Sequence, residues 1–346
     1  MNQSVLYALG AAALFGASTP LAKLLNGDMP PVLLAGLLYL GSGVGLTVTR
    51  LLRDRGFKPA GLPKGEWAWL LGAVFFGGVL GPVALMFGLR SSDASTASLL
   101  LNLEAVLTAV IAWVAFKENA DGRIVAGMLA IVAGGVVLGW QTGAHAASGA
   151  AGPALVGLAC LCWAIDNNLT RKVSASDALF IAGVKGVIAG TVNSVLAALM
   201  GATLPGYASL ALSLAIGFFG YGISLVLFVL ALRGLGTART GAYFSTAPFL
   251  GAGLALLLLP EASPPGFWLA AGLMVLGVWL HLTENHTHPH RHDMLQHAHE
   301  HTHDAHHQHA HASEDSDAAA HSHWHTHEAV EHSHRHYPDA HHRHVH

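Results

Sequence analysis

Long apolar stretches alternate with short polar connections along the first 281 residues of the chain. A helix that crosses a membrane needs about 20 mostly apolar residues, because its backbone must satisfy its own hydrogen bonds there. Glycine, proline and charged residues fill the connections, as in "NGDMPP" and "DRGFKPAGLPKGE". The pattern predicts ten transmembrane helices, near residues 4–25, 31–52, 66–89, 93–116, 122–140, 152–170, 178–200, 208–232, 237–258 and 264–281.

This pattern stops after His281. From residue 282 to residue 346 the chain has no apolar periodicity, and alanine, serine, aspartate and glutamate separate its histidines. Of the 25 histidines, 24 lie at or beyond His281. A segment of this composition cannot bury enough apolar surface to fold alone. We therefore expect an all-α polytopic membrane protein followed by a disordered C-terminal tail.

Composition excludes a soluble domain, and charge sets the expected orientation. Charged residues make up 11% of the chain, hydrophobic residues 53%, and the mean hydropathy is +0.48; a soluble domain carries about 25% charged residues. Basic residues concentrate in cytoplasmic connections. With the N-terminus inside, only Lys23 and Arg90 lie near the outer side. We expect a multi-pass protein of the inner (plasma) membrane with both termini cytoplasmic. The cytoplasmic basic residues would be Arg50, Arg53, Arg55, Lys58, Lys64, Lys117, Arg123, Arg171, Lys172, Arg233 and Arg239.

The two halves of the apolar region resemble each other. Residues 88–118 align with residues 231–261 without a gap, and residues 14–23 align more weakly with residues 162–171. Because five spans per copy is an odd number, the second copy must lie inverted in the membrane. Inverted repeats are typical of alternating-access carriers, whose substrate site lies at the repeat interface near the membrane midplane. The expected units are a first five-helix repeat (1–145), an inverted second repeat (146–281) and a His-rich tail (282–346).

These features resemble a known family. Ten spans, a five-plus-five repeat, and fourth and ninth spans that each end in a lone glutamate, Glu118 and Glu261, are similar to the EamA branch of the drug/metabolite transporter superfamily. The usual proline of the fourth span is Ala105 here, whereas the ninth span keeps Pro248. The resemblance implies a secondary carrier with cytoplasmic termini, often an exporter of amino acids or other metabolites. It does not imply a particular substrate.

Polar and ionisable residues at membrane depth are costly, rare and usually functional. Glu104 lies midway along the fourth span beside Asn102, and Lys185 lies a third of the way into the seventh. Asp166 and Asn167 lie deep in the sixth span, and Asn193 lies two helical turns beyond Lys185. The predicted substrate site comprises Glu104, Lys185, Asp166, Asn167, Asn102 and Asn193.

Two interpretations of these residues stay open. In the first, Glu104 and Lys185 neutralise each other or bind a charged substrate, and Glu104 or Asp166 could load a coupling proton. In the second, the same groups form a structural ion pair or hydrogen bonds that hold the helices together.

The tail is a candidate metal-binding segment. Neutral imidazole is a ligand for Ni²⁺, Co²⁺, Cu²⁺ and Zn²⁺, and a flexible His-x-His string lets several rings reach one ion. Binding without physiological purpose, or a polycation formed at low pH, is the alternative. The candidate ligands are His286, His288, His290, His292, His297, His299, His301, His303, His306, His307, His309 and His311.

We therefore expect a secondary active transporter, in the export direction, for a small metabolite, with a tail that binds or senses transition metal. The alternatives are a direct carrier of Ni²⁺, Co²⁺ or Zn²⁺ and a non-transporting membrane metal store or sensor. We expect no enzyme activity, no catalytic residue and no required cofactor; the sequence has no ATP-binding G-x-x-x-x-G-K-[ST] loop. The expected partners are the substrate, membrane lipid and metal ions but no nucleic acid, and the chain would be a monomer or a homodimer.

Overall fold

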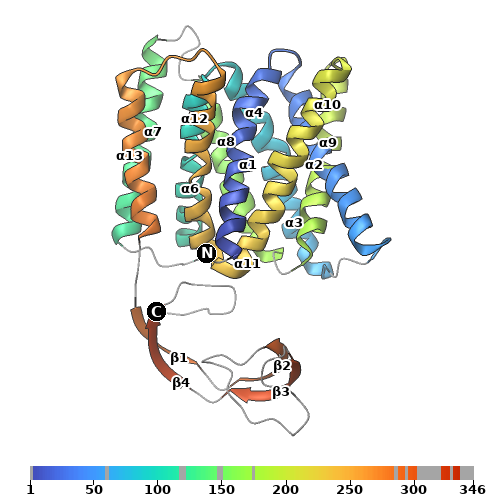
Figure 1. Ribbon diagram of the computed structural model, residues 1–346, viewed down its shortest axis with the longest axis vertical. Helices are drawn as coiled ribbons and strands as arrows, with labels where there is room; N and C mark the ends of the chain where they lie inside the picture. Colours follow the sequence, from blue (N-terminus) through green and yellow to red (C-terminus); the bar gives the residue numbers. More distant parts are fainter. Residues whose placement is uncertain are drawn as a thin grey trace. The chain divides into compact units, whose positions relative to one another are not determined.

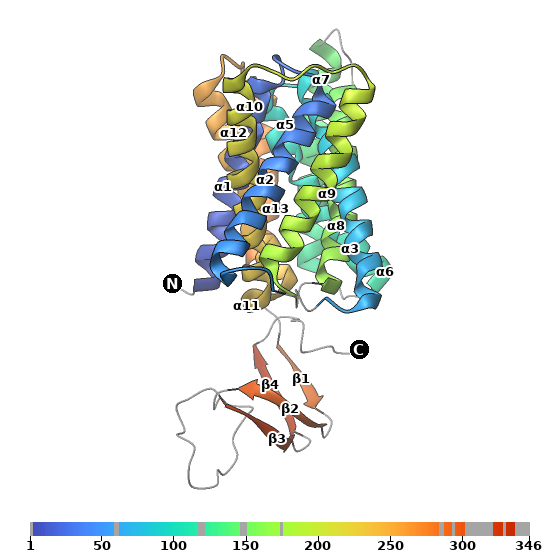
Figure 2. The same ribbon diagram turned by 90° about the vertical axis from the view of Figure 1, so that its right-hand side faces the viewer.

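The computed structural model describes residues 3–58, 62–116, 122–145, 151–173 and 176–283, together with four short strands in the tail. Figures 1 and 2 show the described residues between 3 and 283 as a bundle of long, roughly parallel helices. Its helices are α1 (Gln3–Leu25), α2 (Pro31–Asp54), η1 (Lys64–Glu66), α3 (Trp67–Ala73), η2 (Val74–Leu80), α4 (Gly81–Arg90), α5 (Ala94–Leu100), α6 (Leu103–Phe116), α7 (Gly122–His145), α8 (Ala151–Val173), α9 (Ala178–Leu199), α10 (Tyr207–Ile216), η3 (Gly217–Ile223), α11 (Ser224–Phe244), α12 (Ala247–Leu258) and α13 (Pro265–Leu282).

The bundle confirms the all-α polytopic membrane fold. Within the described residues, nine helices or helix runs are long and apolar enough to cross a membrane. The remaining predicted span is α8, which has 23 residues but is less apolar because it carries Asp166, Arg171 and Lys172. Helix α8 packs against α4 and α6 inside the bundle. Its polar residues therefore lie at a depth where the other helices are apolar.

Three predicted helix boundaries differ from the structure by several residues. Helix α7 continues to His145 rather than stopping near residue 140. The fourth predicted span is two helices, because the chain makes a turn at Leu101 and Asn102 between α5 and α6. The predicted connection at 233–236 is instead helical, since α11 continues to Phe244 before a turn at Ser245 and Thr246. This stretch, "RGLG", contains no proline, so no residue removes a backbone donor from the helix.

The internal repeat is visible in local backbone geometry. The π-helical segments η2 (Val74–Leu80) and η3 (Gly217–Ile223) begin and end 143 residues apart. The sequence offset between Arg90 and Arg233 is the same. Each segment holds two neighbouring phenylalanine rings in edge contact, with centroids 5.2 Å and 5.0 Å apart. Such π-helical turns are rare, so their recurrence at one offset supports two copies of one fold.

Helix packing follows the same repeat. Equivalent helices pair directly, α2 with α9 and α7 with α13, while α1 packs on α11 and α12 as α8 packs on α4 and α6. At the crossing of α2 and α9, a Cβ on Gly43 would clash with the backbone at Gly186 and Val187. A Cβ on Gly186 would clash with the backbone of Gly43. These two glycines, 143 residues apart in the sequence, let the equivalent helices approach closely.

Tryptophans mark both ends of the helices. Trp67, Trp69 and Trp279 are exposed near one end of their helices, and Trp140 and Trp268 are exposed near the opposite end of theirs. Tryptophan is enriched at the two membrane–water interfaces, where its amphipathic ring is stable. This distribution agrees with a bundle that spans a bilayer.

The tail forms a separate unit of the chain. Strand β1 (Thr287–His292) pairs antiparallel with β4 (Val330–Arg335), and β2 (Leu295–His301) pairs antiparallel with β3 (His321–His327). Isolated two-stranded sheets are at best marginally stable in water. This pairing therefore does not make the tail an independently stable domain, and its disorder in solution stays a prediction.

Candidate functional site

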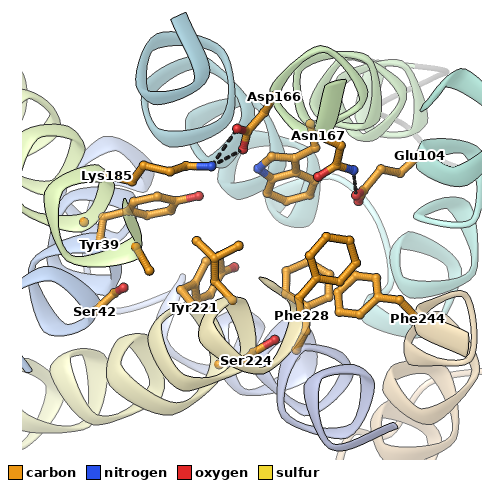
Figure 3. Close-up of a pocket in the computed structure, with 16 residues that line it drawn as sticks. Tyr39, Ser42, Glu104, Asp166, Asn167, Lys185, Tyr221, Ser224, Phe228 and Phe244 are labelled. Carbon is orange, nitrogen blue, oxygen red and sulfur yellow. Dashed lines mark hydrogen bonds and ion pairs between the residues drawn. The ribbon is translucent and has the colours of Figure 1, made fainter. Parts of the chain in front are cut away.

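A cavity lies between the two halves of the bundle (Figure 3). The empty space between its lining residues is about 600 Å³, which includes the open space at its mouth. The first half supplies residues of α1, α2 and α6, and the second half supplies residues of α8, α9, η3 and α11. The lining residues are Phe15, Tyr39, Ser42, Glu104, Trp163, Asp166, Asn167, Ala182, Lys185, Gly186, Gly220, Tyr221, Ser224, Leu225, Phe228 and Phe244.

An ion pair between α8 and α9 lies in the cavity wall. Lys185 Nζ lies 2.6 Å and 2.7 Å from the two carboxylate oxygens of Asp166, and 3.2 Å from Thr170 Oγ1. Thr170, one turn beyond Asp166, also donates a 2.8 Å hydrogen bond to that carboxylate. Lys185 and Asp166 are only 3% and 6% exposed, so each charge depends on the other for compensation.

The π-helical segment η2 makes room for this pair and binds its aromatic neighbours. A Cβ on Gly77 would clash with the carboxylate of Asp166, so only glycine allows η2 to pass this close. The carbonyl oxygen of Gly77 accepts hydrogen bonds from Tyr39 Oη at 2.6 Å and from Trp163 Nε1 at 2.9 Å. The ion pair, the tyrosine and the tryptophan are thus assembled around one π-helical turn.

A second polar pair, Asn167 and Glu104, joins α8 to α6 along the same wall of the cavity (Figure 3). Asn167 Nδ2 donates to Glu104 Oε1 at 2.8 Å, and lies 3.4 Å from Thr108 Oγ1. Glu104 is the second residue of α6, directly after the helix break. Successive residues on a helix point about 100° apart, so Asp166 and Asn167 face α9 and α6 respectively.

Four of the six predicted site residues line the cavity: Glu104, Asp166, Asn167 and Lys185. The sequence left open whether Glu104 and Lys185 neutralise each other; in the structure Lys185 pairs with Asp166 instead. These partners lie on consecutive helices, and Asp166 reaches Lys185 through the gap left by Gly77.

The other two predicted residues bond elsewhere. Asn102 Nδ2 donates to Leu99 O at 3.0 Å and lies 3.8 Å from Met274 Sδ. Asn193 Nδ2 donates to Gly78 O at 3.1 Å. Neither residue lines the cavity. Hydropathy identified them as polar groups at membrane depth but carried no information on which helix each one faces.

An aromatic wall of the cavity was not predicted. The ring centroids of Phe15 and Trp163 are 5.8 Å apart, and those of Tyr39 and Tyr221 are 5.5 Å apart. Phe15 also contacts Tyr221 with centroids 5.9 Å apart. Aromatic residues are equally common on lipid-facing surfaces, so the sequence alone gives no signal for this wall. The alignment of 14–23 with 162–171 does make Phe15 and Trp163 equivalent, and equivalent residues of two repeats meet at the axis that relates them.

Salt bridges join α2 to the start of α9 at one end of the bundle. Arg53 pairs with Asp177, and Arg50 Nε lies 3.5 Å from the same carboxylate. Asp177 also caps α9, because its side chain accepts from the backbone amides of Leu179 and Phe180. Burial raises the pKa of Asp177, but the hydrogen bond from Arg53 and those from the backbone outweigh it, so the pKa lies below the usual value.

The predicted metal ligands fall in the tail. His286, His303, His306, His307, His309 and His311 lie outside the described residues. For His288, His290, His292, His297, His299 and His301 the structure describes the backbone alone, in β1 and β2. Among the described residues, no three His, Cys, Asp or Glu side chains gather as a metal site would require.

Comparison with known proteins agrees with this architecture. The model of the EamA-like transporter family matches residues 2–140 and again residues 150–283. A protein of Methanothermobacter thermautotrophicus described as an uncharacterized transporter is 27% identical over 267 residues, which are 72% of this chain and 78% of that protein. A crystal structure with 20% sequence identity shares the fold, with a TM-score of 0.63 over 81% of this chain and 95% of the other. The two family matches together cover most of the apolar region, and the chain belongs to the EamA-like transporter family.

Proposed function

We propose that this transporter is a secondary carrier of a small polar metabolite, which binds in the cavity between the two repeats. The observation that carries the proposal is the pairing of Lys185 with Asp166 in the wall of a cavity that Glu104 also lines. Burying ionisable groups at membrane depth is costly, and they are usually retained there for function. Alternating access would arise as the two repeats rock about this site.

The chemistry of the wall favours a substrate with a charged or strongly polar group. Asp166 is already compensated by Lys185, whereas Asn167 is the sole hydrogen-bond donor to Glu104 among the described residues. The aromatic rings of Tyr221, Phe228 and Phe244 offer apolar surface on the opposite wall (Figure 3). A molecule with a polar head and an apolar body would satisfy both walls. We propose export as the direction, which the family resemblance favours.

Metabolite exchange in proteoliposomes tests this proposal. Purified full-length protein would be reconstituted into proteoliposomes that are loaded with an unlabelled candidate metabolite. Counterflow is then measured as uptake of the same metabolite in labelled form. We expect Lys185→Ala to abolish exchange, while Lys64→Ala, which removes an exposed lysine outside the cavity, leaves it intact. Exchange that survives Lys185→Ala would move the substrate site elsewhere in the bundle.

We also propose that both termini are cytoplasmic, in the inner membrane, and that the tail binds transition-metal ions there. The support is the number of histidines, 24 of 25 at or beyond His281, and the excess of basic residues in the connections on one side. A direct metal carrier is less well supported, since the residues that the structure describes hold no group of three metal-ligating side chains.

Truncation after Leu282 separates the tail from the carrier. Calorimetric titration of the full-length protein with Ni²⁺ or Zn²⁺ should show several sites, and these should vanish in the truncated protein. Binding should weaken as the pH falls through roughly 6.5, because protons compete for imidazole nitrogen. Metal binding that persists after truncation would place the metal sites in the helical bundle.

A further inference from the structure

The charges that line the cavity do not balance. Among the described residues that line it are two carboxylates, Glu104 and Asp166, but a single basic side chain, Lys185. The other lining residues carry no charge at neutral pH. A charge at membrane depth is costly unless a charge of opposite sign compensates it. With both carboxylates ionised, the cavity therefore lacks one positive charge.

Lys185 has no hydrogen left for a ligand. An ammonium group has three N–H donors, and Lys185 Nζ lies 2.6 Å and 2.7 Å from the two oxygens of Asp166 and 3.2 Å from Thr170 Oγ1. A substrate anion could bind Lys185 only by displacing Asp166, which would leave that carboxylate buried and unpaired. An anionic group on a substrate thus finds no available cation among the residues that line the cavity.

Glu104 is the carboxylate that stays uncompensated. Its Oε1 accepts a hydrogen bond from Asn167 Nδ2 at 2.8 Å, but an amide is neutral and brings no positive charge. Asp166 already holds Lys185 with both of its oxygens. A cation that enters the cavity would therefore pair with Glu104 rather than with Asp166.

Phenylalanine rings from α1 and α11 lie in the same cavity as Glu104. The ring centroid of Phe244 is 5.4 Å from that of Phe15 and 4.9 Å from that of Phe228. Figure 3 shows Phe228 and Phe244 below Glu104 and Asn167 in the view. We refer to Phe15, Phe228 and Phe244 as the phenylalanine cluster. The face of an aromatic ring attracts organic cations, and the attraction grows where water is excluded.

We propose that the substrate is an organic cation: an amine or alkylated ammonium with an apolar body and no carboxylate. Its charge pairs with Glu104, and the phenylalanine cluster contacts its alkyl groups. This inference rests on the proposed carrier and its cavity, and it adds the charge class of the substrate. It sets the chain apart from carriers of amino acids, because an amino acid would bring a carboxylate for which the cavity has no free cation.

Binding of small probes to the purified full-length protein tests the charge class. Benzyltrimethylammonium, phenylalanine and benzenesulfonate share a phenyl ring but are a cation, a zwitterion and an anion. Calorimetric titration in detergent micelles at neutral pH should show the cation binding at least about tenfold more tightly than the other two probes. Cation binding that is no tighter than anion binding, or no cation binding at all, would overturn the proposal.

Glu104→Gln tests whether the charge of Glu104 carries this preference. Glutamine keeps an oxygen that can accept from Asn167, so the hydrogen bond survives while the charge is lost. The affinity for benzyltrimethylammonium should fall at least about tenfold, and the affinities for phenylalanine and benzenesulfonate should not fall. The matched control is Glu66→Gln, because Glu66 lies in η1 outside the cavity. An unchanged cation affinity in Glu104→Gln would overturn the pairing.

Phe244→Leu is a second test, which also serves if Glu104→Gln yields too little folded protein. Leucine keeps an apolar side chain but has no aromatic face, so the affinity for benzyltrimethylammonium should fall about fivefold. Phe87→Leu is its control, because Phe87 is 38% exposed and lies outside the cavity. Equal cation affinities of these two variants would overturn the role of the phenylalanine cluster.

Counterflow of benzyltrimethylammonium separates this inference from the proposed carrier. The permanent charge of this probe prevents it from crossing the bilayer as a neutral base. Binding that depends on Glu104 without any exchange would count against the carrier and leave the cation site standing. Exchange of a carboxylate-bearing metabolite that Lys185→Ala abolishes, with no cation binding, would keep the carrier and overturn the cation class.

Discussion

The two repeats share one backbone scaffold but contribute different ionisable residues to the cavity. Both hold a π-helical turn and a helix break at equivalent positions, with the break at Asn102 in the first half and at Ser245, 143 residues later, in the second. A Cβ on Gly77 would clash with Asp166, and a Cβ on the equivalent Gly220 would clash with Ser18. The backbone geometry is therefore repeated even where the side chains beside it differ.

The charges have no counterparts in the other repeat. The alignment makes Asp166 equivalent to Ser18, and the glycine contact between α2 and α9 makes Lys185 equivalent to Ser42. Glu104, from the first half, is equivalent to Ala247. In the proposed carrier, symmetric packing would let the two repeats exchange conformations, whereas a substrate without symmetry would need different groups on its two sides. Under that proposal, the shared glycines maintain the scaffold and the unshared charges are the candidates for recognition.

Replacing the ion pair with its first-half counterparts gives the largest expected effect. Lys185→Ser alone leaves Asp166 buried and unpaired, so the free energy of unfolding should fall by about 3–5 kcal/mol. The double variant Asp166→Ser with Lys185→Ser recreates the neutral pair of the first half and should lose much less. Both variants should lose transport. Unfolding in mixed micelles measures the free energy of unfolding of each variant. A double variant as unstable as Lys185→Ser alone would contradict the prediction.

The glycines of the α2–α9 crossing should behave alike, in contrast to the ion pair. Gly43→Ala and Gly186→Ala each place a Cβ against the facing backbone, so each should lower the free energy of unfolding by about 1–3 kcal/mol. Gly253→Ala is the control, because nothing lies within 4 Å of its added Cβ. Clearly unequal effects of Gly43→Ala and Gly186→Ala would show that the packing around the two glycines differs, although the backbone geometry is repeated.

Hydropathy predicted most of the fold because a bilayer imposes it directly. Each span needs a long apolar run, and the boundaries of α1, α2 and α9 lie within two residues of the prediction. The helix break at Leu101 and Asn102 was missed, since it lies inside an apolar run with no proline or glycine. The helical stretch through 233–236 was missed for the opposite reason, because two glycines and an arginine there resemble a connection.

Four residues that line the cavity could be singled out from the sequence, but their contacts could not. Depth alone identified Glu104, Lys185, Asp166 and Asn167, because polar groups are rare in the spans. Their pairing depends on the rotation of each helix about its axis and on the gap at Gly77. Neither quantity is present in a pattern of hydrophobic and polar positions.

Glu104→Gln tests the charge that the first half alone contributes. Glutamine keeps an oxygen that can accept from Asn167, so the free energy of unfolding should change by less than about 1 kcal/mol. Transport should nevertheless fall at least about tenfold, which corresponds to 1.4 kcal/mol, because the side chain can no longer gain or lose a proton. Counterflow at matched protein levels measures this. Undiminished transport would assign Glu104 a structural role and leave recognition to the second half.

The smallest expected effect concerns the helix starts that the two halves cap differently. Asp177 directly precedes helix α9, and its side chain caps that helix and binds Arg53. Helix α2 follows Pro30 and has no side-chain cap. Asp177→Asn can keep the cap but loses the charge, so it should cost about 0.2–1 kcal/mol, the range of partly exposed ion pairs. Asp177→Ala loses the cap as well and should cost about 1 kcal/mol more.

The pH dependence of this contribution follows from the lowered pKa of Asp177. A carboxyl group whose pKa is depressed by folding binds a proton more readily in the unfolded chain. Its stabilisation is therefore complete above the unfolded pKa of about 3.9 and is lost as the pH falls through the lower folded value. Unfolding measured at pH 7 and at acidic pH should show the gap between the native protein and Asp177→Asn closing in acid. A gap that stays constant would mean that the carboxylate acts through packing rather than charge, and that capping is all that distinguishes the start of α9 from the start of α2.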